Sequence, residues 1–231
     1  MIIPARFNGP AATGNGGYSA GLFASHVRPA VSSDVDGVLE ITLRRPPPLD
    51  TEMTVRPGDP AGLVAGLFVQ DVLIAEARPG EVTGDDVVPA VPLSEARRVA
   101  AEYPGFREHP FPTCFVCGPE REPGDGLRVF PGRLPDGGVA APFFAPPDVS
   151  PAVIWAALDC PSGWAVPLEA RPYLLGRMAA RVDAGPDPGE ECVVVASMVG
   201  EEGRKAYSRS TLYSPRGDVL AVARATWVAL A

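Results

Sequence analysis

The apolar positions of the chain fall into two kinds of pattern. Segments 18–27 (YSAGLFASHV) and 152–160 (AVIWAALDC) are nearly continuous runs of apolar and small residues, which predict two helices packed in a core. A turn signal precedes each helix, TGNGG at 13–17 and APPDVSP at 145–151. The same plan, a turn and then a buried helix, therefore occurs twice.

Each predicted helix is followed by short segments with the character of strands, separated by turn residues. In the first half these are Gly37–Arg45, Thr51–Pro57, Ala61–Val69 and Asp71–Pro79. In the second half they are Tyr173–Val182, Glu191–Val199, Gly203–Ser214 and Asp218–Leu230. Between the halves, LSEARRVAAEYPG predicts one short helix with Ser94 as its N-cap.

A helix followed by a meander of strands, repeated, indicates an α+β fold. Each antiparallel sheet hides its apolar face on its own helix, and joining the two sheets edge to edge removes a pair of exposed strand edges. We divide the chain into a repeat at 1–90, a connecting segment at 91–138 and a second repeat at 139–231.

Composition narrows the class of protein. The chain has 231 residues, 46% hydrophobic and 21% charged, which is an ordinary globular balance. A formal net charge of −8 argues against nucleic acid as a partner, because binding it needs clustered positive charge. No apolar run is long enough to cross a membrane and no secretory leader is visible, so we expect a cytoplasmic protein, with a homo-oligomer left open.

One acid stands out in this pattern. Asp159 interrupts the apolar stretch VIWAALDCPSGWA, and burying an unpaired carboxylate is costly, so the residue is paired, exposed at a turn, or kept for chemistry. Pro161 favours the turn, because proline disfavours continuation of a helix. Chemistry and a helix-ending turn therefore both stay open at this point.

Four segments resemble the hotdog-fold thioesterases. NGGYSAGLFA (15–24) looks like their His-Gly-Gly helix start, and ITLRRPPPLDTEMTV (41–55) like the strand, turn and strand that follow. WAALDCPSGWA (155–165) looks like the acid-bearing helix of the phenylacetate-type members, and GDVLAVARATWV (217–228) like their closing hairpin. The resemblance implies a double hotdog, in which two sheets, each wrapped around a helix, join into one continuous sheet.

The resemblance also implies site residues. In the first half Asn15, Gly16 and Gly17 match His-Gly-Gly, but Ala24 stands at the acid position; in the second half Asp159 matches the acid, while Ser150 to Ala152 replace His-Gly-Gly. In the family, the glycine amide of one subunit and the aspartate of the other face the same thioester. We therefore expect one intact site per chain, with the opposite site degenerate.

These residue types suit thioester hydrolysis. Backbone amides of Gly16 and Gly17 at a helix N-terminus would stabilise the oxyanion, and Asp159, with its pKa raised by burial, would act as general base or nucleophile. The expected substrate is a thioester of coenzyme A or acyl carrier protein, with no cofactor beyond the coenzyme A of the substrate. A non-catalytic acyl-binding protein and a hydratase or dehydratase using His26 are the alternatives.

The sequence gives weaker evidence for other kinds of functional site. Cys114 and Cys117 have the spacing of half a zinc site, to which His109 could add a ligand, while Cys160 and Cys192 are isolated in apolar segments. We predict no metal site but leave zinc at Cys114 and Cys117 open. Cys160 lacks an evident base for a nucleophile. Five basic residues could contact coenzyme A phosphates or form a solvated face: Arg177, Arg181, Arg204, Lys205 and Arg209.

Overall fold

A computed structural model describes residues 1–27, 38–59, 62–167 and 171–230 of the chain. Two of the expected strand starts, Gly37 and Ala61, and the last residue, Ala231, lie outside the described residues. No helix in the described part of the chain is both long enough and apolar enough to cross a membrane.

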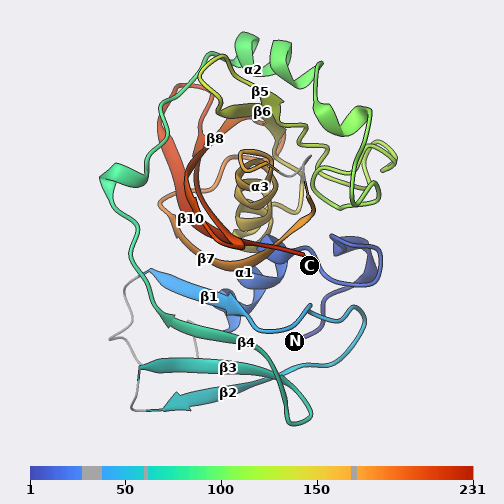
Figure 1. Cartoon of the computed structure of the whole chain (residues 1–231), viewed down its shortest axis with the longest axis vertical. Coiled ribbons are helices and arrows are strands. Elements are labelled where there is room, and N and C mark those ends of the chain that lie inside the picture. The colour runs from blue at the N-terminus through green and yellow to red at the C-terminus, as the bar shows by residue number, and fades with distance from the viewer. Residues whose placement is uncertain (28–37, 60–61, 168–170, 231) are drawn as a thin grey trace.

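The strands of the described residues form one antiparallel sheet of ten strands (Figure 1). The first half contributes β1 (Leu39–Leu43), β2 (Thr54–Asp59), β3 (Leu63–Val69) and β4 (Val72–Pro79). The connecting segment contributes β5 (Gly132–Arg133). The second half contributes β6 (Val139–Phe144), β7 (Tyr173–Val182), β8 (Glu191–Glu202), β9 (Lys205–Tyr213) and β10 (Val219–Ala229). Their order in the sheet is β2-β3-β4-β1-β7-β10-β9-β8-β6-β5.

The two halves join through β1 and β7. These strands pair antiparallel, with Ile41 opposite Met178 and Leu39 opposite Ala180. The expectation of one continuous sheet is therefore confirmed. In Figure 1 the strands of the second half curve around helix α3 (Pro151–Trp164), which lies against the concave face of the sheet.

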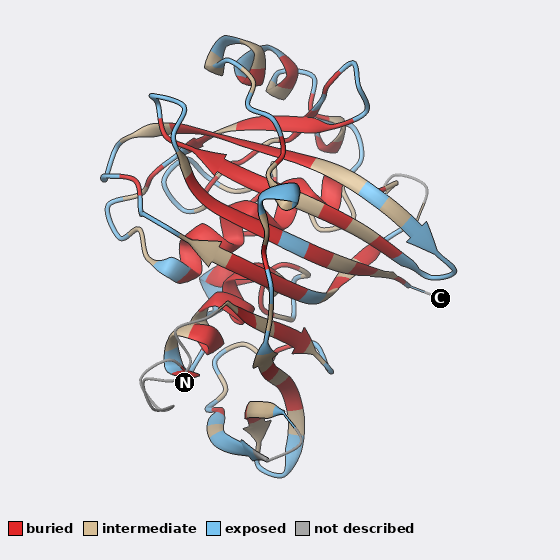
Figure 2. Cartoon of the chain, turned by 90° about the vertical axis from the view of Figure 1, so that its left-hand side faces the viewer, coloured by how far each residue is buried: buried red, intermediate tan, exposed pale blue. Residues whose placement is uncertain are grey.

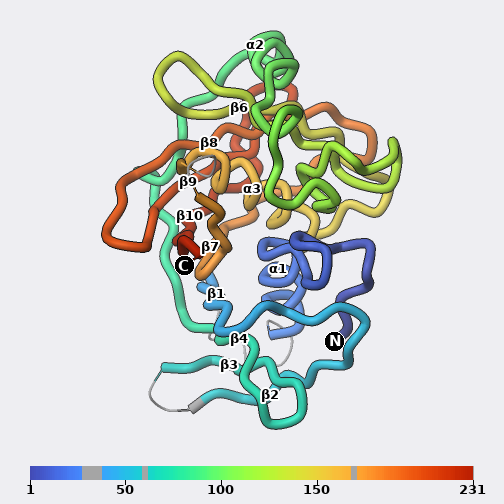
Figure 3. Tube along the Cα trace, turned by 45° about the vertical axis from the view of Figure 1, so that its right-hand side comes forward, coloured from blue at the N-terminus to red at the C-terminus, as the bar shows by residue number. Residues whose placement is uncertain are grey.

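Two central helices lie side by side inside this sheet (Figure 3). They are α1 (Gly16–Val27) and α3 (Pro151–Trp164), and they run antiparallel, since Gly17 faces Asp159 while Gly21 faces Trp155. A Cβ atom on Gly21 would lie 2.7 Å from Trp155 Cβ, so the absence of a side chain lets the two helices approach closely.

One hydrophobic core serves both halves. Phe23 of α1, Ile41 of β1, Leu158 of α3 and Met178 of β7 belong to the same cluster of buried side chains. Figure 2 shows buried residues along the central helices and the middle of the sheet, and exposed residues at the outer ends of strands and in loops. The chain segments therefore cannot bury their apolar faces independently of each other.

The connecting segment folds onto the second half. It contains α2 (Leu93–Ala100), which packs on β6, and a 3-10 turn at Pro104–Phe106. The expected cap at Ser94 is wrong: the helix begins at Leu93, Pro92 occupies the cap position, and no side chain caps it. Two further 3-10 turns in the described residues are Ala5–Phe7 and Gly84–Asp86.

The helix-ending turn at Pro161 is also wrong. α3 continues through Pro161 to Trp164, although proline removes one helical hydrogen bond. Hydroxyl groups bond to the neighbouring carbonyl oxygens: Ser210 of β9 donates to Leu158 O and Ser162 donates to Asp159 O, both at 2.9 Å. Asp159 therefore lies inside a buried helix rather than at its end.

Candidate functional site

The site begins at the N-terminus of α1. Asn15 is the residue before the helix, and its Oδ1 accepts the Tyr18 amide at 2.8 Å, which is the geometry of an N-cap. This bond fixes the orientation of the side-chain amide, so Nδ2 points toward α3 and donates to Asp159 Oδ2 at 3.1 Å. Asn15 is 3% exposed.

Asp159 comes from the middle of α3 and is 2% exposed. Its Oδ2 accepts two hydrogen bonds from the first half of the chain, from Gly17 N at 2.9 Å and from Asn15 Nδ2. Its Oδ1 is buried and has no hydrogen-bond partner among the described residues. Burial raises the pKa of the Asp159 carboxyl to about 7, against the lowering effect of the Gly17 and Asn15 hydrogen bonds.

The two glycines differ in their surroundings. The amide of Gly17, expected to stabilise an oxyanion, donates to Asp159, and a Cβ on Gly17 would meet Asp159 Cβ at 2.3 Å, so helix α3 occupies the space expected for substrate. The amide of Gly16 has no hydrogen-bond partner in the part of the chain that the structure describes. Gly16, rather than Gly17, presents a free donor at the helix N-terminus.

Two adjoining pockets meet at Gly16. The inner pocket has a volume of about 60 Å³ and is lined by Asn15, Gly16 and Asp159 together with aromatic and cysteine side chains. The outer pocket has a volume of about 250 Å³. Four residues line both pockets: Pro10, Gly16, Leu174 and Leu175. A ligand in the outer pocket could therefore reach the inner one past the Gly16 amide.

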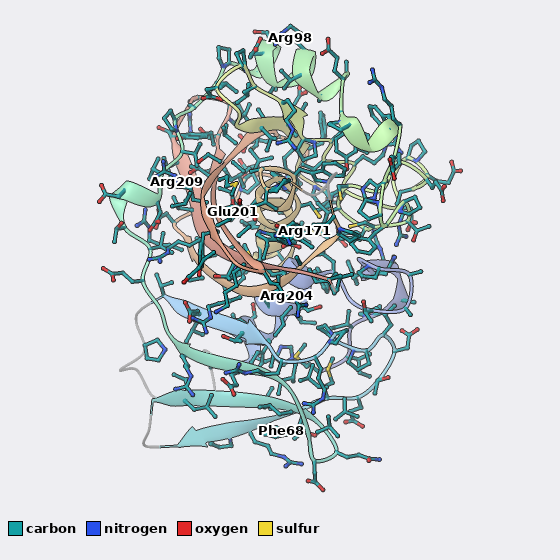
Figure 4. All side chains as sticks on the ribbon, in the orientation of Figure 1. Phe68, Arg98, Arg171, Glu201, Arg204 and Arg209 are labelled. Carbon is teal, nitrogen blue, oxygen red and sulfur yellow. The ribbon has the colours of Figure 1, made fainter. Side chains whose placement is uncertain are left out.

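Arginine side chains gather at the outer pocket, which is lined by Arg44, Arg45 and Arg204. Arg44 is paired with Glu76 at 2.7 Å. Neither Arg45 nor Arg204 has an acidic partner among the described residues, since Arg45 donates to Leu73 O and Arg204 to Ala229 O. Figure 4 shows Arg204 near the end of β10.

The other basic residues considered from the sequence do not line either pocket. Arg177 lies 3.4 Å from Glu40, Arg181 3.0 Å from Asp183, and Arg209 bonds to Ser197 at 3.2 Å. They belong to the outward face of the sheet.

A cluster of sulfur atoms borders the inner pocket. Cys114 and Cys117 of the connecting segment and Cys160 of α3 have sulfur atoms within 4.8 Å of one another, and all three side chains are buried. Cys160, isolated in the sequence, is thus brought to the Cys-x-x-Cys loop, with 3.8 Å between its Sγ and that of Cys114. The neighbouring thiols of Cys117 and Cys160 lower the pKa of Cys114 well below its ordinary value.

Three residues considered from the sequence lie away from Asp159. His26 is exposed in the last turn of α1, where it contacts Leu22 O, nine residues and therefore about 14 Å along the helix from Gly17. Ser150 caps α3 by accepting the Val153 amide, and Ala24 is buried. His26 consequently cannot share a substrate atom with Asp159 in this arrangement.

Comparison with solved structures addresses the fold. A protein with a hot dog fold from Alicyclobacillus acidocaldarius matches at 12% identity and TM-score 0.55, over 98% of this chain and 90% of that chain. The chain is a double hotdog. An acyl-CoA thioesterase II, TesB2, from Mycobacterium marinum matches at 16% identity and TM-score 0.56, over 99% and 91%.

A third similar structure has a different reaction. The dehydratase domain of PpsC from Mycobacterium tuberculosis, in complex with C12:1-CoA, matches at 15% identity and TM-score 0.59, over 95% of this chain and 86% of that domain. No protein-family model and no curated protein matches the chain. At these identities the matches establish the fold, and the activity has to be argued from the site.

Sequence reasoning missed Phe111, Tyr173 and Trp227 as lining residues of the inner pocket. It singled out His109, Cys114 and Cys117 by the Cys-x-x-Cys spacing, but as possible zinc ligands and not as residues beside Asp159. Which side chains converge on Asp159 depends on how the connecting segment folds back, and no short-range pattern reports that.

Proposed function

We propose that the protein hydrolyses short-chain acyl-CoA thioesters at the composite site formed by the two halves of the chain. The observation that carries the proposal is the position of Asp159, a buried carboxylate held by Gly17 and Asn15, with its Oδ1 free and with the unpaired Gly16 amide lining the same pocket.

The reaction needs a donor for the carbonyl oxygen and a base or nucleophile for the carbonyl carbon. The Gly16 N–H would stabilise the negative charge that develops on the oxygen, assisted by its place at the positive end of α1. Asp159 Oδ1 would take a proton from water as the water oxygen bonds to carbon, or would bond to carbon directly. In the first route the carbon–sulfur bond then breaks, coenzyme A leaves as the thiolate and the free acid remains. In the second, loss of the thiolate leaves an anhydride between the acyl group and Asp159, which water hydrolyses to the free acid.

Asn15 and Gly17 would then be positioning residues. Their hydrogen bonds hold Asp159 Oδ2 and so turn Oδ1 away from them. Asn15 replaces the histidine of the resembled motif and retains a side-chain donor toward the acid. This division of roles departs from the expectation that both glycine amides serve the substrate.

Pocket size and charge support the choice of substrate. An inner volume of about 60 Å³ holds only a few water-sized groups, which favours a short acyl chain. The outer pocket is large enough for the start of the thiol arm, and Arg45 and Arg204 offer charge to the phosphates of coenzyme A. An acyl carrier protein would also bring one phosphate, so the carrier is part of the test.

The test is steady-state hydrolysis of a panel of acyl-CoA esters of increasing length, each compared with the matching N-acetylcysteamine ester and the matching acyl-carrier-protein thioester. We expect the highest kcat/KM for short chains and a drop of at least about 100-fold in kcat for Asp159→Asn. Arg204→Ala should raise KM for acyl-CoA and leave the phosphate-free N-acetylcysteamine esters unaffected.

Asp71→Asn is the matched control, because the Asp71 side chain is 96% exposed in the turn between β3 and β4. Equal hydrolysis by the wild type and Asp159→Asn would refute the mechanism. Tight acyl-CoA binding without turnover would favour a binding protein, and hydration of enoyl-CoA without thioester hydrolysis would favour the dehydratase class.

A further inference from the structure

The sulfur cluster beside Asp159 is not used by the proposed hydrolysis. Its members, Cys114, Cys117 and Cys160, come from a loop and from helix α3, and all three are free of disulfide bonds. Buried cysteines are common singly as small apolar residues. Three that converge from distant parts of the sequence on one point, with their sulfur atoms facing each other, need a separate explanation.

The spacing of the sulfur atoms fits a tetrahedral metal. With a metal–sulfur distance of about 2.3 Å, two thiolates of a tetrahedral zinc site lie about 3.8 Å apart. The Sγ atoms of Cys114 and Cys160 are 3.8 Å apart, and Cys117 Sγ lies within 4.8 Å of both. Small side-chain rotations would bring all three to equal distances from one ion.

Hydrogen-bond donors surround these sulfur atoms. Asn15 Nδ2 lies 3.7 Å from Cys160 Sγ and 3.9 Å from Cys114 Sγ, and His109 Nε2 lies 3.4 Å from Cys117 Sγ. Donors of this kind are typical partners of metal-bound thiolates, because they offset the negative charge on sulfur.

His109 acts as a donor here rather than as a fourth ligand. Its Nδ1 lies 2.8 Å from the Phe111 amide, which can only donate, so Nδ1 accepts and the ring proton is on Nε2. A protonated Nε2 has no lone pair for a metal. The protein ligand set is therefore three thiolates, which leaves one coordination position on the side of the pocket.

We propose that Cys114, Cys117 and Cys160 bind a soft divalent cation, with zinc as the natural occupant. Thiolates select such ions over magnesium or calcium. The ion would link the loop that carries Cys114 and Cys117 to helix α3 next to Asp159. The site adds to the proposed hydrolysis and does not depend on it.

The test measures metal on the full chain without any substrate. Protein purified under reducing conditions without chelator is analysed for zinc by mass spectrometry, and a metal-free sample is titrated anaerobically with Co²⁺. We expect one ion per chain and the intense visible and near-ultraviolet bands of tetrahedral cobalt–thiolate coordination.

Cys160→Ala should weaken zinc binding by at least about 100-fold in competition with a chromophoric chelator. Cys192→Ala is the matched control, because Cys192 is buried in β8 outside the cluster and should bind zinc as the wild type does. Circular dichroism establishes that each variant is folded, and the cobalt spectrum of the wild type does not rely on any variant.

Two results would overturn the proposal: reduced wild-type protein that takes up neither zinc nor cobalt, or a folded Cys160→Ala variant that binds them as tightly as the wild type. Because no acyl-CoA enters the assay, failure of the metal site and failure of the hydrolase proposal are separate outcomes.

Discussion

At the scale of single residues, burying the Asp159 carboxylate costs free energy that hydrogen bonds from the surrounding protein only partly offset. Two donors bond to Oδ2, while Oδ1 is buried without a partner among the described residues. A buried acceptor left unbonded costs about 1–3 kcal/mol. A buried carboxylate with a raised pKa that lines a pocket is a candidate for a functional group.

The raised pKa of Asp159 makes stability depend on pH. The folded chain holds this proton more tightly than the unfolded chain, because the pKa is about 7 when folded and 3.8 ordinarily. The destabilising effect is absent below the ordinary pKa, grows as pH rises between the two values, and is complete above about 7. At about 1.4 kcal/mol per pKa unit its full size is about 4 kcal/mol.

Asp159→Asn removes this titration and keeps the shape of the side chain. We expect urea unfolding to show the variant more stable than the wild type at about pH 8, by up to about 4 kcal/mol, with the gap narrowing steadily toward pH 5. Asp71→Asn, at an exposed site, should show no such convergence. A difference in the free energy of unfolding that stays constant over this range would mean that folding does not raise the pKa of Asp159.

At the scale of elements, the pair of central helices is set by glycines on one of them. Gly17 and Gly21 face Asp159 and Trp155, so the site exists only because α1 and α3 approach closely. The hydrogen bond from Gly17 to Asp159 therefore depends on the short distance between the two helices.

Gly21→Ala tests this contact. A new Cβ would lie 2.7 Å from Trp155 Cβ and 2.9 Å from the Ala152 Cα, which is backbone and cannot rotate away. Overpacking costs about 1–3 kcal/mol, and the gain in helix propensity returns only about 1 kcal/mol. We expect a lower Tm and weaker activity, because the helices must separate.

Gly200→Ala is the control for that substitution. A Cβ on Gly200, near the end of β8, would meet nothing within 4 Å, so its Tm should stay close to that of the wild type. A Gly21→Ala variant as stable and active as the wild type would show that the helices do not need this close approach.

The elements also show how far the sequence can be read. The strand expected at Tyr173–Val182 has those bounds in the structure, because its mostly apolar run and the turn residues that follow report the strand locally. The strand Val139–Phe144 is not evident in the sequence, since Pro142 and the paired phenylalanines obscure the alternation. The continuation of α3 past Pro161 is accompanied by a hydrogen bond from Ser210 of a distant strand to Leu158 O, a contact that no local pattern contains.

At the scale of the whole molecule, the fusion of two unlike repeats decides which half-sites remain. The family resemblance predicts that Asn15, Gly16 and Gly17 share one site with Asp159. The structure places them beside the acid, but Gly17 donates to Asp159 instead of facing a substrate. The prediction is possible because both motifs lie on helices with a fixed pseudo-symmetric partner. The residues that enclose the site come from the connecting segment, whose fold the repeat pattern does not determine.

The symmetry of the helix pair makes a prediction about stoichiometry. The position equivalent to Asp159 in the first half is Ala24, and Ala152 stands where the second half would need a glycine. Without an acid and a glycine amide, that side has neither the base nor the close-approaching donor. We expect calorimetric titration with a non-hydrolysable acyl-CoA analogue to give one site per chain, abolished or strongly weakened by Gly16→Leu, which would fill the space beside Leu175. Ala24→Leu, on the opposite side, should leave that stoichiometry unchanged in a folded variant. Two sites per chain in the wild type would contradict the prediction, because they would show that the acid is not required for binding and that the degenerate half retains a pocket of its own.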